Sequence, residues 1–319
     1  MISHDITPEI VQAIWDKHNL GKIETIERPS RGIVNHTSIV NDAYVIRFDV
    51  LEDYDWPGIS RYASEKWAYE TLRGSDVPVP DVIAYDASKT LAPYDYLILS
   101  KLPGKTVHDS LVDLTAKAQH TIAYRAGEYL ATIHSYAYPS DGFGLLFNVA
   151  AGVRMADWAA YVAYFFQDYI GQVRKLGLLP EAIFVRIEAV RAKMGSLLAL
   201  VQQGQLVHGD YHFSNMLQQN GEISGVIDFE WAQSGDPSWD FRIDDDLETS
   251  SPGSSDAFYA GYISRRALPD HHAERVALYR VGLYLDYLTF EDDSEHDLTR
   301  GLLLKELVWL EARLSGGDL

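Results

Sequence analysis

Three side chains within residues 206–240 have types and a spacing that can carry out chemistry: Asp210, Asn215 and Asp228. Short apolar segments rich in β-forming residues surround them, and an Asn-Gly pair at 220–221 separates two of these segments. Asn-Gly between apolar runs is a strong signal for a β-hairpin. We therefore expect a loop that carries Asp210 and Asn215, followed by a hairpin that ends at Asp228, so that the three side chains face one point.

Two carboxylates and one amide in this arrangement suit phosphoryl transfer. In that reaction the protein mainly aligns the attacking hydroxyl and neutralises charge on the phosphates. Asp210 can accept the hydroxyl proton, while Asn215 and Asp228 can hold Mg²⁺, a cation that prefers oxygen ligands. The interval between Asp210 and Asn215 is that of the protein-kinase catalytic loop, and Asp228 precedes a phenylalanine, as the kinase metal-binding Asp does.

The segments HGDYHFSN, VIDFE and SGDPSWD follow one another between residues 208 and 240. Their order and separation resemble the aminoglycoside phosphotransferase and choline kinase-like family, which is related to the protein kinases. The resemblance implies a two-lobed α+β fold of the protein-kinase type. Residues 1–102 would form a small nucleotide-binding lobe with an antiparallel sheet and a helix, and residues 103–319 a larger, mainly helical lobe. It also implies ATP or GTP as cofactor, Mg²⁺, and a small-molecule hydroxyl that accepts the γ-phosphate.

The resemblance also assigns two charged residues of the first lobe. Arg47 lies in the strand-like segment 43–50, where kinases place the lysine that contacts the α- and β-phosphates. An arginine keeps the charge and can bind phosphate through two N–H groups; an exposed strand cation is the alternative. Glu65, on the expected helix 60–74, resembles the family's glutamate that pairs with this cation, and Glu70 is its competitor.

Two further segments resemble the family's nucleotide contacts. SRGIVNHTSIV resembles the phosphate loop, which assigns Asn35 and Ser38 to the nucleotide, whereas an ordinary hairpin is the alternative reading of this segment alone. The apolar strand expected at 94–102 leads into the hinge between the lobes. By the resemblance, the Ser100 carbonyl and the Leu102 N–H would meet the nucleotide base there, and a plain strand-to-helix crossing is the alternative.

Apolar residues at helical spacing predict most of the remaining chain to be helical. The expected helices cover residues 7–18, 115–133, 157–170, 180–202, 256–266, 270–292 and 294–314. Within the segment SGDPSWD, Asp236 and Asp240 resemble the family's residues that support the catalytic loop and do no chemistry.

The composition limits the classes of partner. The chain has 319 residues and a formal charge of −19, so a broad basic surface for nucleic acid is not expected. It contains no cysteine, which fits the reducing cytosol. The N-terminus lacks the apolar core of a signal peptide, and no segment reaches the roughly 18 apolar residues of a membrane span. We therefore expect a cytoplasmic protein with a small-molecule partner, and the sequence does not give its oligomeric state.

The sequence is compatible with several classes of acceptor. Acidic residues at 244–248 and 291–293, together with Asp286, can form a pocket for an amine-bearing acceptor such as an aminoglycoside, or a solvated acidic face. Antibiotic-modifying family members often carry a further acid in the catalytic loop, where this chain has Phe213. That difference favours a less cationic acceptor, such as a macrolide, a sugar, or a choline-like or homoserine-like amino alcohol.

Other classes of protein remain as alternatives. His208, Asp210 and His212 also resemble a metallohydrolase cluster, although no matching second cluster follows in the sequence. A nucleotide-binding pseudokinase would keep the fold and lose turnover, and the intact Asp210, Asn215 and Asp228 argue against it. A protein kinase is disfavoured, because no APE-type motif follows Asp228.

Overall fold

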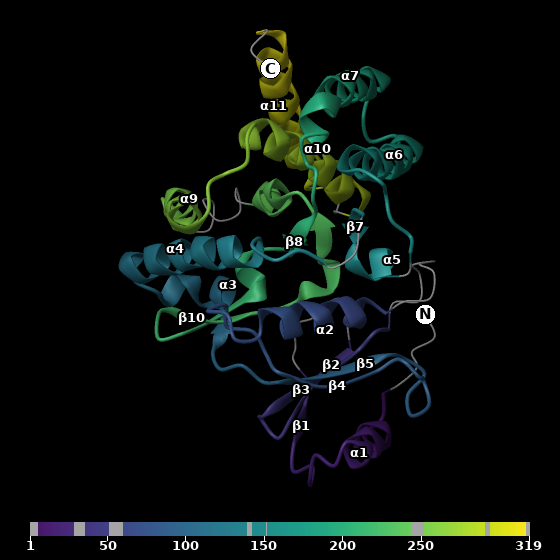
Figure 1. Ribbon diagram of the computed structural model, residues 1–319, viewed down its shortest axis with the longest axis vertical. Helices are drawn as coiled ribbons and strands as arrows, with labels where there is room; N and C mark the ends of the chain where they lie inside the picture. Colours follow the sequence, from purple (N-terminus) through teal and green to yellow (C-terminus); the bar gives the residue numbers. More distant parts are fainter. Residues whose placement is uncertain are drawn as a thin grey trace.

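The N-terminal part of the chain builds a five-stranded antiparallel sheet, which lies in the lower part of Figure 1. The computed structural model describes residues 6–28, 36–50, 60–138, 142–150, 152–243, 252–290 and 294–316. The strands are ordered β1 (Ile26–Glu27), β2 (His36–Val40), β3 (Tyr44–Phe48), β5 (Tyr96–Ser100) and β4 (Val82–Asp86).

Side-chain alternation gives this sheet two different faces. Ile46 of β3 belongs to the apolar cluster made with helix α1 (Pro8–Lys17), whereas Leu97 of β5 belongs to the cluster made with helix α2 (Arg61–Leu72). Arg47 is paired directly with Leu97 across the two strands. Because successive residues of a strand point to opposite faces, Arg47 lies on the face that α2 covers.

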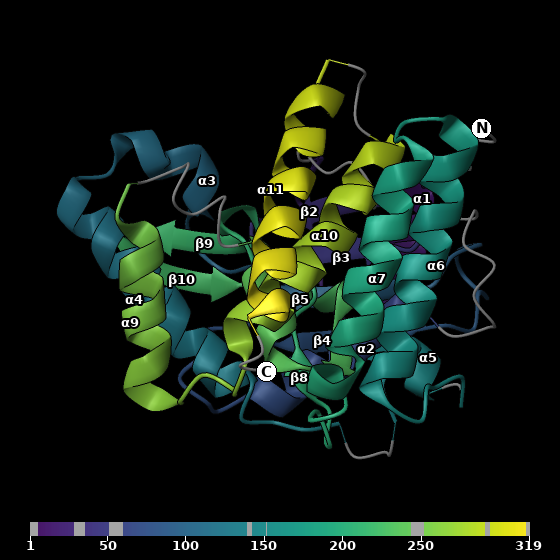
Figure 2. The ribbon, with the colours of Figure 1, turned by 90° about the horizontal axis from the view of Figure 1, so that it is seen from above.

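The rest of the chain is mainly helical and lies above α2 in Figure 1. Its helices are α3 (Val107–Ser110), α4 (Ala116–Ile133), α5 (Leu146–Ala150), α6 (Trp158–Leu176), α7 (Glu181–Leu198), α9 (Ser254–Arg265), α10 (His272–Phe290) and α11 (His296–Ser315). Seen from above, α6, α7, α10 and α11 form one group, and α4 and α9 lie together on the opposite side (Figure 2).

Two small three-stranded sheets lie between these helix groups and the N-terminal sheet. One has the order β10 (Glu222–Val226), β9 (Met216–Gln219), β6 (Lys105–Thr106), and the other β7 (Gly144–Leu145), β11 (Gln233–Gly235), β8 (Gln205–Val207). Strands β9 and β10 are antiparallel, with Gln219 opposite Glu222. Asn220 and Gly221 between them have φ of 55° and 82°, which is the left-handed backbone that a tight hairpin turn requires. The hairpin predicted at 220–221 is therefore confirmed.

The two-lobed kinase-like α+β fold expected from the sequence is confirmed. The division after residue 102 stays a proposal. Its support is that β5 ends at Ser100, whereas β6 pairs with β9 of the helical part. Asn35 and the acidic segments at 244–248 and 291–293 lie outside the described residues.

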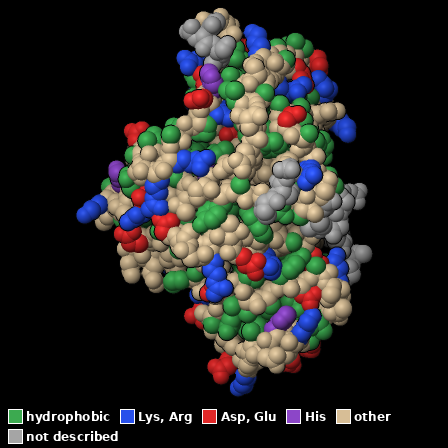
Figure 3. Space-filling view, viewed as in Figure 1, with side chains coloured by type: hydrophobic (Ala, Val, Ile, Leu, Met, Phe, Trp, Pro, Cys, Tyr) green, Lys and Arg blue, Asp and Glu red, His purple; other side chains and the backbone are tan. Residues whose placement is uncertain are grey.

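Charged side chains of both signs are intermixed on the face shown in Figure 3, and no large patch of lysine and arginine covers it. In the described part of the chain, no helix has the length and the apolar character needed to cross a membrane.

Helices α4 and α9 approach so closely that their backbones touch at two glycines. A Cβ atom at Gly127 of α4 would lie 2.0 Å from the Phe258 carbonyl oxygen, and one at Gly261 of α9 would lie 1.9 Å from the Tyr124 carbonyl oxygen. Real Cβ atoms do not approach backbone oxygen this closely, so any larger residue would push the helices apart.

We predict that Gly127→Ala lowers the free energy of unfolding by about 1–3 kcal/mol, the range for forcing extra atoms into a packed interior. Gly171→Ala on α6 is the matched control, because a Cβ there meets nothing within 4 Å. Replacing a helical glycine by alanine in open space should stabilise by roughly 0.5–1 kcal/mol. Urea unfolding of both variants measures the difference, and equal effects would contradict the close approach.

Candidate active site

The loop after β8 is held in place through its backbone by one buried carboxylate. Asp240 accepts hydrogen bonds from the backbone N–H of His208 (2.7 Å) and of Gly209 (2.8 Å), and its Oδ2 lies 3.0 Å from His134 Nε2. Burial acts to raise the pKa of Asp240, but the His134 hydrogen bond and these donors hold it below its usual value. The contacts of Asp240 are those that the predicted supporting role requires.

His208 links this loop to the segment that carries Asp228. Its Nδ1 accepts the backbone N–H of Asp210 (3.3 Å), and its Nε2 lies 3.0 Å from the Ile227 carbonyl oxygen, to which it donates. Burial lowers the pKa of His208, so the ring is neutral and its single proton is on Nε2. Both ring nitrogens are engaged within the protein, so His208 orients the loop and is not placed as a metal ligand.

Asp210 and Asn215, which the sequence predicted to converge, are in direct contact. The Asn215 side-chain amide donates to Asp210 Oδ2 (2.8 Å) and to the Asp210 carbonyl oxygen (2.9 Å). His212 Nε2 lies 3.2 Å from the same Oδ2. Burial acts to raise the pKa of Asp210, but the His212 hydrogen bond and nearby positive charge, including Arg242, lower it to about 2. The Asp210 carboxyl group is therefore ionised at neutral pH, and its side chain is 37% exposed to solvent.

A backbone hydrogen bond joins the segment that carries Asp228 to the segment that carries Asn215. The Ile227 N–H, one residue before Asp228, donates to the Asn215 carbonyl oxygen at 3.0 Å. Its own φ and ψ are 71° and 58°, a left-handed conformation that is uncommon for a residue other than glycine. The Tyr69 hydroxyl on α2 accepts the Asp228 backbone N–H at 3.0 Å. The side chain of Asp228 is 32% exposed, so its carboxylate is partly open while its backbone N–H is held by α2.

Arg47 reaches the site from the sheet and contacts both parts of the molecule. Its Nη1 donates to Glu65 Oε1 at 2.5 Å, and its Nη2 donates to Asp228 Oδ1 at 2.9 Å. Tyr69 adds a hydrogen bond of 2.7 Å to the same Glu65 oxygen. Burial acts to lower the pKa of Arg47, but Asp228 and Glu65 raise it well above its usual value. The structure therefore joins Arg47 to Glu65, whereas Glu70 is exposed and pairs with Lys66 at 2.6 Å.

Sequence reasoning missed two charged residues of this site. Glu230 is 4% exposed and lies 3.2 Å from Arg47 Nη2 through its Oε2. Arg242 donates to the carbonyl oxygen of Gly209 at 2.6 Å, immediately before Asp210. The signal available for Glu230 was its place in the segment VIDFE, and Arg242 has no such signal, because its target is a backbone oxygen.

Not all of the other residues that were predicted to bind the nucleotide lie beside Arg47 and Asp228. Ser38 is 1% exposed and is paired with Ile46, so its side chain lies on the α1 face, away from Arg47. Ser100 ends β5, and its hydroxyl accepts the Asp81 backbone N–H at 2.9 Å. Leu102 lies against β10, where a Cβ at Gly225 would fall 2.7 Å from Leu102 Cδ1. The roles of Ser100 and Leu102 through their backbones stay predictions.

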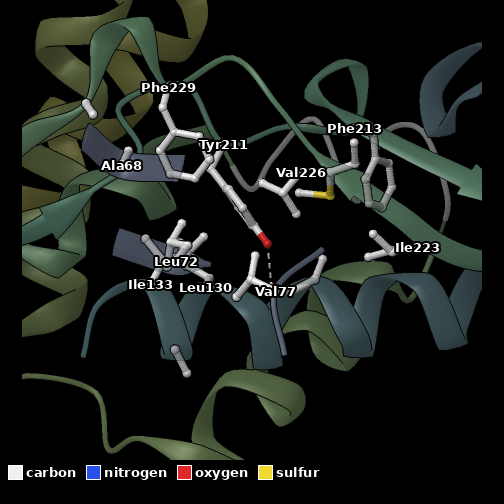
Figure 4. Packing of buried hydrophobic residues seen from close by; sticks show 14 of the residues in the cluster. Ala68, Leu72, Val77, Leu130, Ile133, Tyr211, Phe213, Ile223, Val226 and Phe229 are labelled. Carbon is white, nitrogen blue, oxygen red and sulfur yellow. Dashed lines mark hydrogen bonds between the residues drawn. The ribbon is translucent and has the colours of Figure 1, made fainter. Parts of the chain in front are cut away.

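Phe213 in the catalytic loop points into the core. Figure 4 shows it beside Ile223 and Val226, and its exposure is 4%. In the same view the Tyr211 hydroxyl donates to the Ala126 carbonyl oxygen of α4, at 2.8 Å. Phe213 therefore anchors the loop in the core, and the less cationic acceptor that the missing acid favours stays a prediction.

Asn215 and Asp228 suit Mg²⁺ as a pair of oxygen donors. Mg²⁺ in phosphoryl-transfer sites is usually held by one or two carboxylates together with substrate phosphates and water. The Asn215 amide nitrogen faces Asp210, which leaves its amide oxygen for a cation. Across the described ranges, His, Asp and Glu are nowhere grouped three or more together as a metal site. The ring nitrogens of His212 are used toward Asp210 and the Ser214 N–H, so the metallohydrolase arrangement is not formed around Asp210.

Comparison with known proteins agrees with this geometry. The model of a phosphotransferase enzyme family matches residues 25–275. The aminoglycoside phosphotransferase APH(2'')-Ib with bound ADP is 20% identical, with a TM-score of 0.65 and 97% of each chain covered. A Thermobifida fusca protein provisionally described as a fructosamine-3-kinase is 17% identical, with a TM-score of 0.69 over 95% of this chain and 98% of that one.

Aminoglycoside phosphotransferase APH(4)-Ia is 16% identical, with a TM-score of 0.64 over 98% of this chain and 100% of that one. At these identities the solved structures establish the fold, and their kinase-like architecture is the one described above. The family match rests on sequence and spans most of the chain, from the N-terminal sheet to the start of α10. The protein is therefore an enzyme that belongs to the aminoglycoside phosphotransferase (APH) family of phosphotransferases.

Proposed function

We propose that this phosphotransferase moves the γ-phosphate of ATP, or of GTP, to a hydroxyl of a small molecule at the site formed by Arg47, Asp210, Asn215 and Asp228. The observation that carries the proposal is the 2.9 Å contact between Arg47 of the sheet and Asp228 of the helical part. This contact brings a phosphate-binding cation beside a metal-binding carboxylate. Neighbouring structures that hold ADP or GDP support the nucleotide as a ligand.

Each side chain has a defined task in this proposal. Asp210 is ionised, oriented by Asn215, and accepts the proton of the attacking hydroxyl. Asn215 and Asp228 would hold Mg²⁺, which supplies neutralisation of phosphate charge when bound. Arg47, fixed by Glu65, binds the α- and β-phosphate oxygens.

The adenine or guanine base of the nucleotide would lie against the Ser100 carbonyl and the Leu102 N–H, next to β10. For the phosphate loop, the assignment of Asn35 remains a prediction outside the described residues. The assignment of Ser38 is restricted to its backbone, because the side chain faces α1. We also propose a cytoplasmic location, which the absence of cysteine supports.

We propose a polar, amine-bearing or sugar-like acceptor. Asp286 lies on α10, which packs against the segment 237–243 that carries Arg242, and burial raises its pKa to about 6 against the opposing effects of Tyr169 and Arg242. This acid therefore carries charge at neutral pH and can meet an amine. One similar structure, at 20% identity, is a complex of APH(2'')-IIa with gentamicin. An ATP-consumption screen over aminoglycosides, macrolides, sugars and choline-like alcohols, with Mg²⁺ present, identifies the acceptor, and no consumption with any of them would contradict the proposal.

Asp210→Asn should lower turnover by roughly 10²–10⁴-fold, the contribution of a positioned base, because the amide cannot take the hydroxyl proton. Binding of Mg²⁺-ATP should be unchanged, since Asp210 is not a proposed metal ligand. Calorimetric titration and an ADP-release assay measure the two quantities. Asp297→Asn is the matched control, as that side chain is 94% exposed on α11. Full turnover in the Asp210 variant would contradict its assignment as base.

Asp228→Ala should weaken binding of Mg²⁺-ATP by at least about tenfold, the lower end of what disturbing a metal shell costs. The affinity for ATP in EDTA should change much less. Asp228→Asn is the companion variant, because asparagine tolerates the left-handed backbone at this position and so separates metal loss from backbone strain. Mg²⁺-ATP affinity equal to that of the wild type in both variants would contradict the metal role.

A further inference from the structure

The Nη2 nitrogen of Arg47 donates hydrogen bonds to two carboxylates at once. Nη1 is committed to Glu65 at 2.5 Å, whereas Nη2 lies 2.9 Å from Asp228 Oδ1 and 3.2 Å from Glu230 Oε2. The side chain of Arg47 is 10% exposed and that of Glu230 is 5% exposed. Buried charges of this kind must stay paired, because an unpaired buried charge is strongly destabilising.

Glu230 is itself held at a fixed place between two arginines. It lies in the short 3₁₀ segment Phe229–Trp231, two residues after Asp228. Its Oε1 lies 3.6 Å from Arg61 Nη1, and Arg61 in turn donates to Asp49 at 2.5 Å and stacks over the Trp231 ring at 5.6 Å. The carboxylate is thus anchored to the start of α2 and faces the Arg47 arm.

The hydrogen bond that brings Arg47 beside Asp228 must be released from Oδ1 before that oxygen can bind Mg²⁺. A guanidinium N–H on Oδ1 occupies an oxygen lone pair and places positive charge beside a site meant for a divalent cation. The arm can leave Asp228 only if another acceptor is within reach. Glu230 is such an acceptor, because it already accepts a hydrogen bond from the same Nη2 at 3.2 Å, so this nitrogen can leave Asp228 and remain paired.

We propose that Glu230 is a positioning residue that takes over the Nη2 arm of Arg47 when Asp228 binds Mg²⁺. The inference rests on the proposed function, since it concerns the same metal and nucleotide. It makes Arg47 and Glu230 a functional pair. A lysine at position 47 has one ammonium group and no counterpart of Nη2. In the Arg47→Lys background, Glu230 would therefore have no guanidinium nitrogen to hold.

The test compares the wild type with Glu230→Gln, Arg47→Lys and the double variant. For each, ATP binding is titrated calorimetrically at increasing Mg²⁺ and in EDTA, and thermal unfolding is recorded without ligand. We expect Glu230→Gln to raise the half-saturating Mg²⁺ concentration about tenfold when Arg47 is present, and to raise it less than about twofold in the Arg47→Lys background. Affinity for ATP in EDTA should be nearly unchanged by the Glu230 substitution.

Two further variants make the result specific. Glu230→Asp keeps the charge on a shorter side chain, so its half-saturating Mg²⁺ concentration should lie between those of the wild type and Glu230→Gln. This variant serves as the test if Glu230→Gln does not fold. Glu70→Gln removes an exposed acid of α2 that pairs with Lys66, and should change neither quantity.

Three outcomes would overturn the inference. An equal rise in the required Mg²⁺ in the wild-type and Arg47→Lys backgrounds would make Glu230 a metal ligand. A lower melting temperature with unchanged Mg²⁺ dependence would make its role purely structural. Absence of Mg²⁺-ATP binding in the wild type would refute the proposed function itself, and this inference with it.

Discussion

The site depends on one buried cation that bridges the two parts of the molecule. Arg47 comes from the N-terminal sheet, and its guanidinium contacts Glu65 of α2 and Asp228 of the helical part. A charge in this environment is tolerated because carboxylates surround it. The same contact fixes where the sheet stands relative to the catalytic loop. Because an arginine has two arms in a plane, it can hold a carboxylate on each side, which a lysine cannot do in the same way.

The catalytic loop has little regular structure, so side chains from distant segments fix its backbone. Asp240 binds two consecutive N–H groups, Arg242 binds the carbonyl oxygen of Gly209, and His208 crosses to Ile227. A Cβ atom at Gly209, where φ is 87°, would lie 2.0 Å from the Trp231 carbonyl oxygen. This close approach requires glycine and brings the two catalytic segments together. The loop is therefore positioned by side chains of the protein itself, which would preorganise Asp210 for the proposed proton transfer.

Local patterns in the sequence predicted much of the fold and the central site. The hairpin at 220–221 followed from turn chemistry, and the spacing of Asp210 and Asn215 predicted a contact that the structure contains. Pairings between distant segments were not predictable. The segment VIDFE places Glu230 in a motif, but nothing local marks it as a partner of Arg47, or Arg242 as a partner of Gly209. The side on which Ser38 lies depends on strand register, and the burial of Phe213 depends on packing against distant helices. A single sequence does not specify either of these.

The most direct test of the central claim is a crystal structure with ATP and Mn²⁺, in which anomalous scattering locates the metal. The account predicts a metal peak bonded to the Asn215 amide oxygen and to an Asp228 carboxylate oxygen. The triphosphate should lie between this metal and Arg47, with Asp210 open toward the acceptor side. A metal bound elsewhere, or a nucleotide that touches neither Arg47 nor Asp228, would contradict the account.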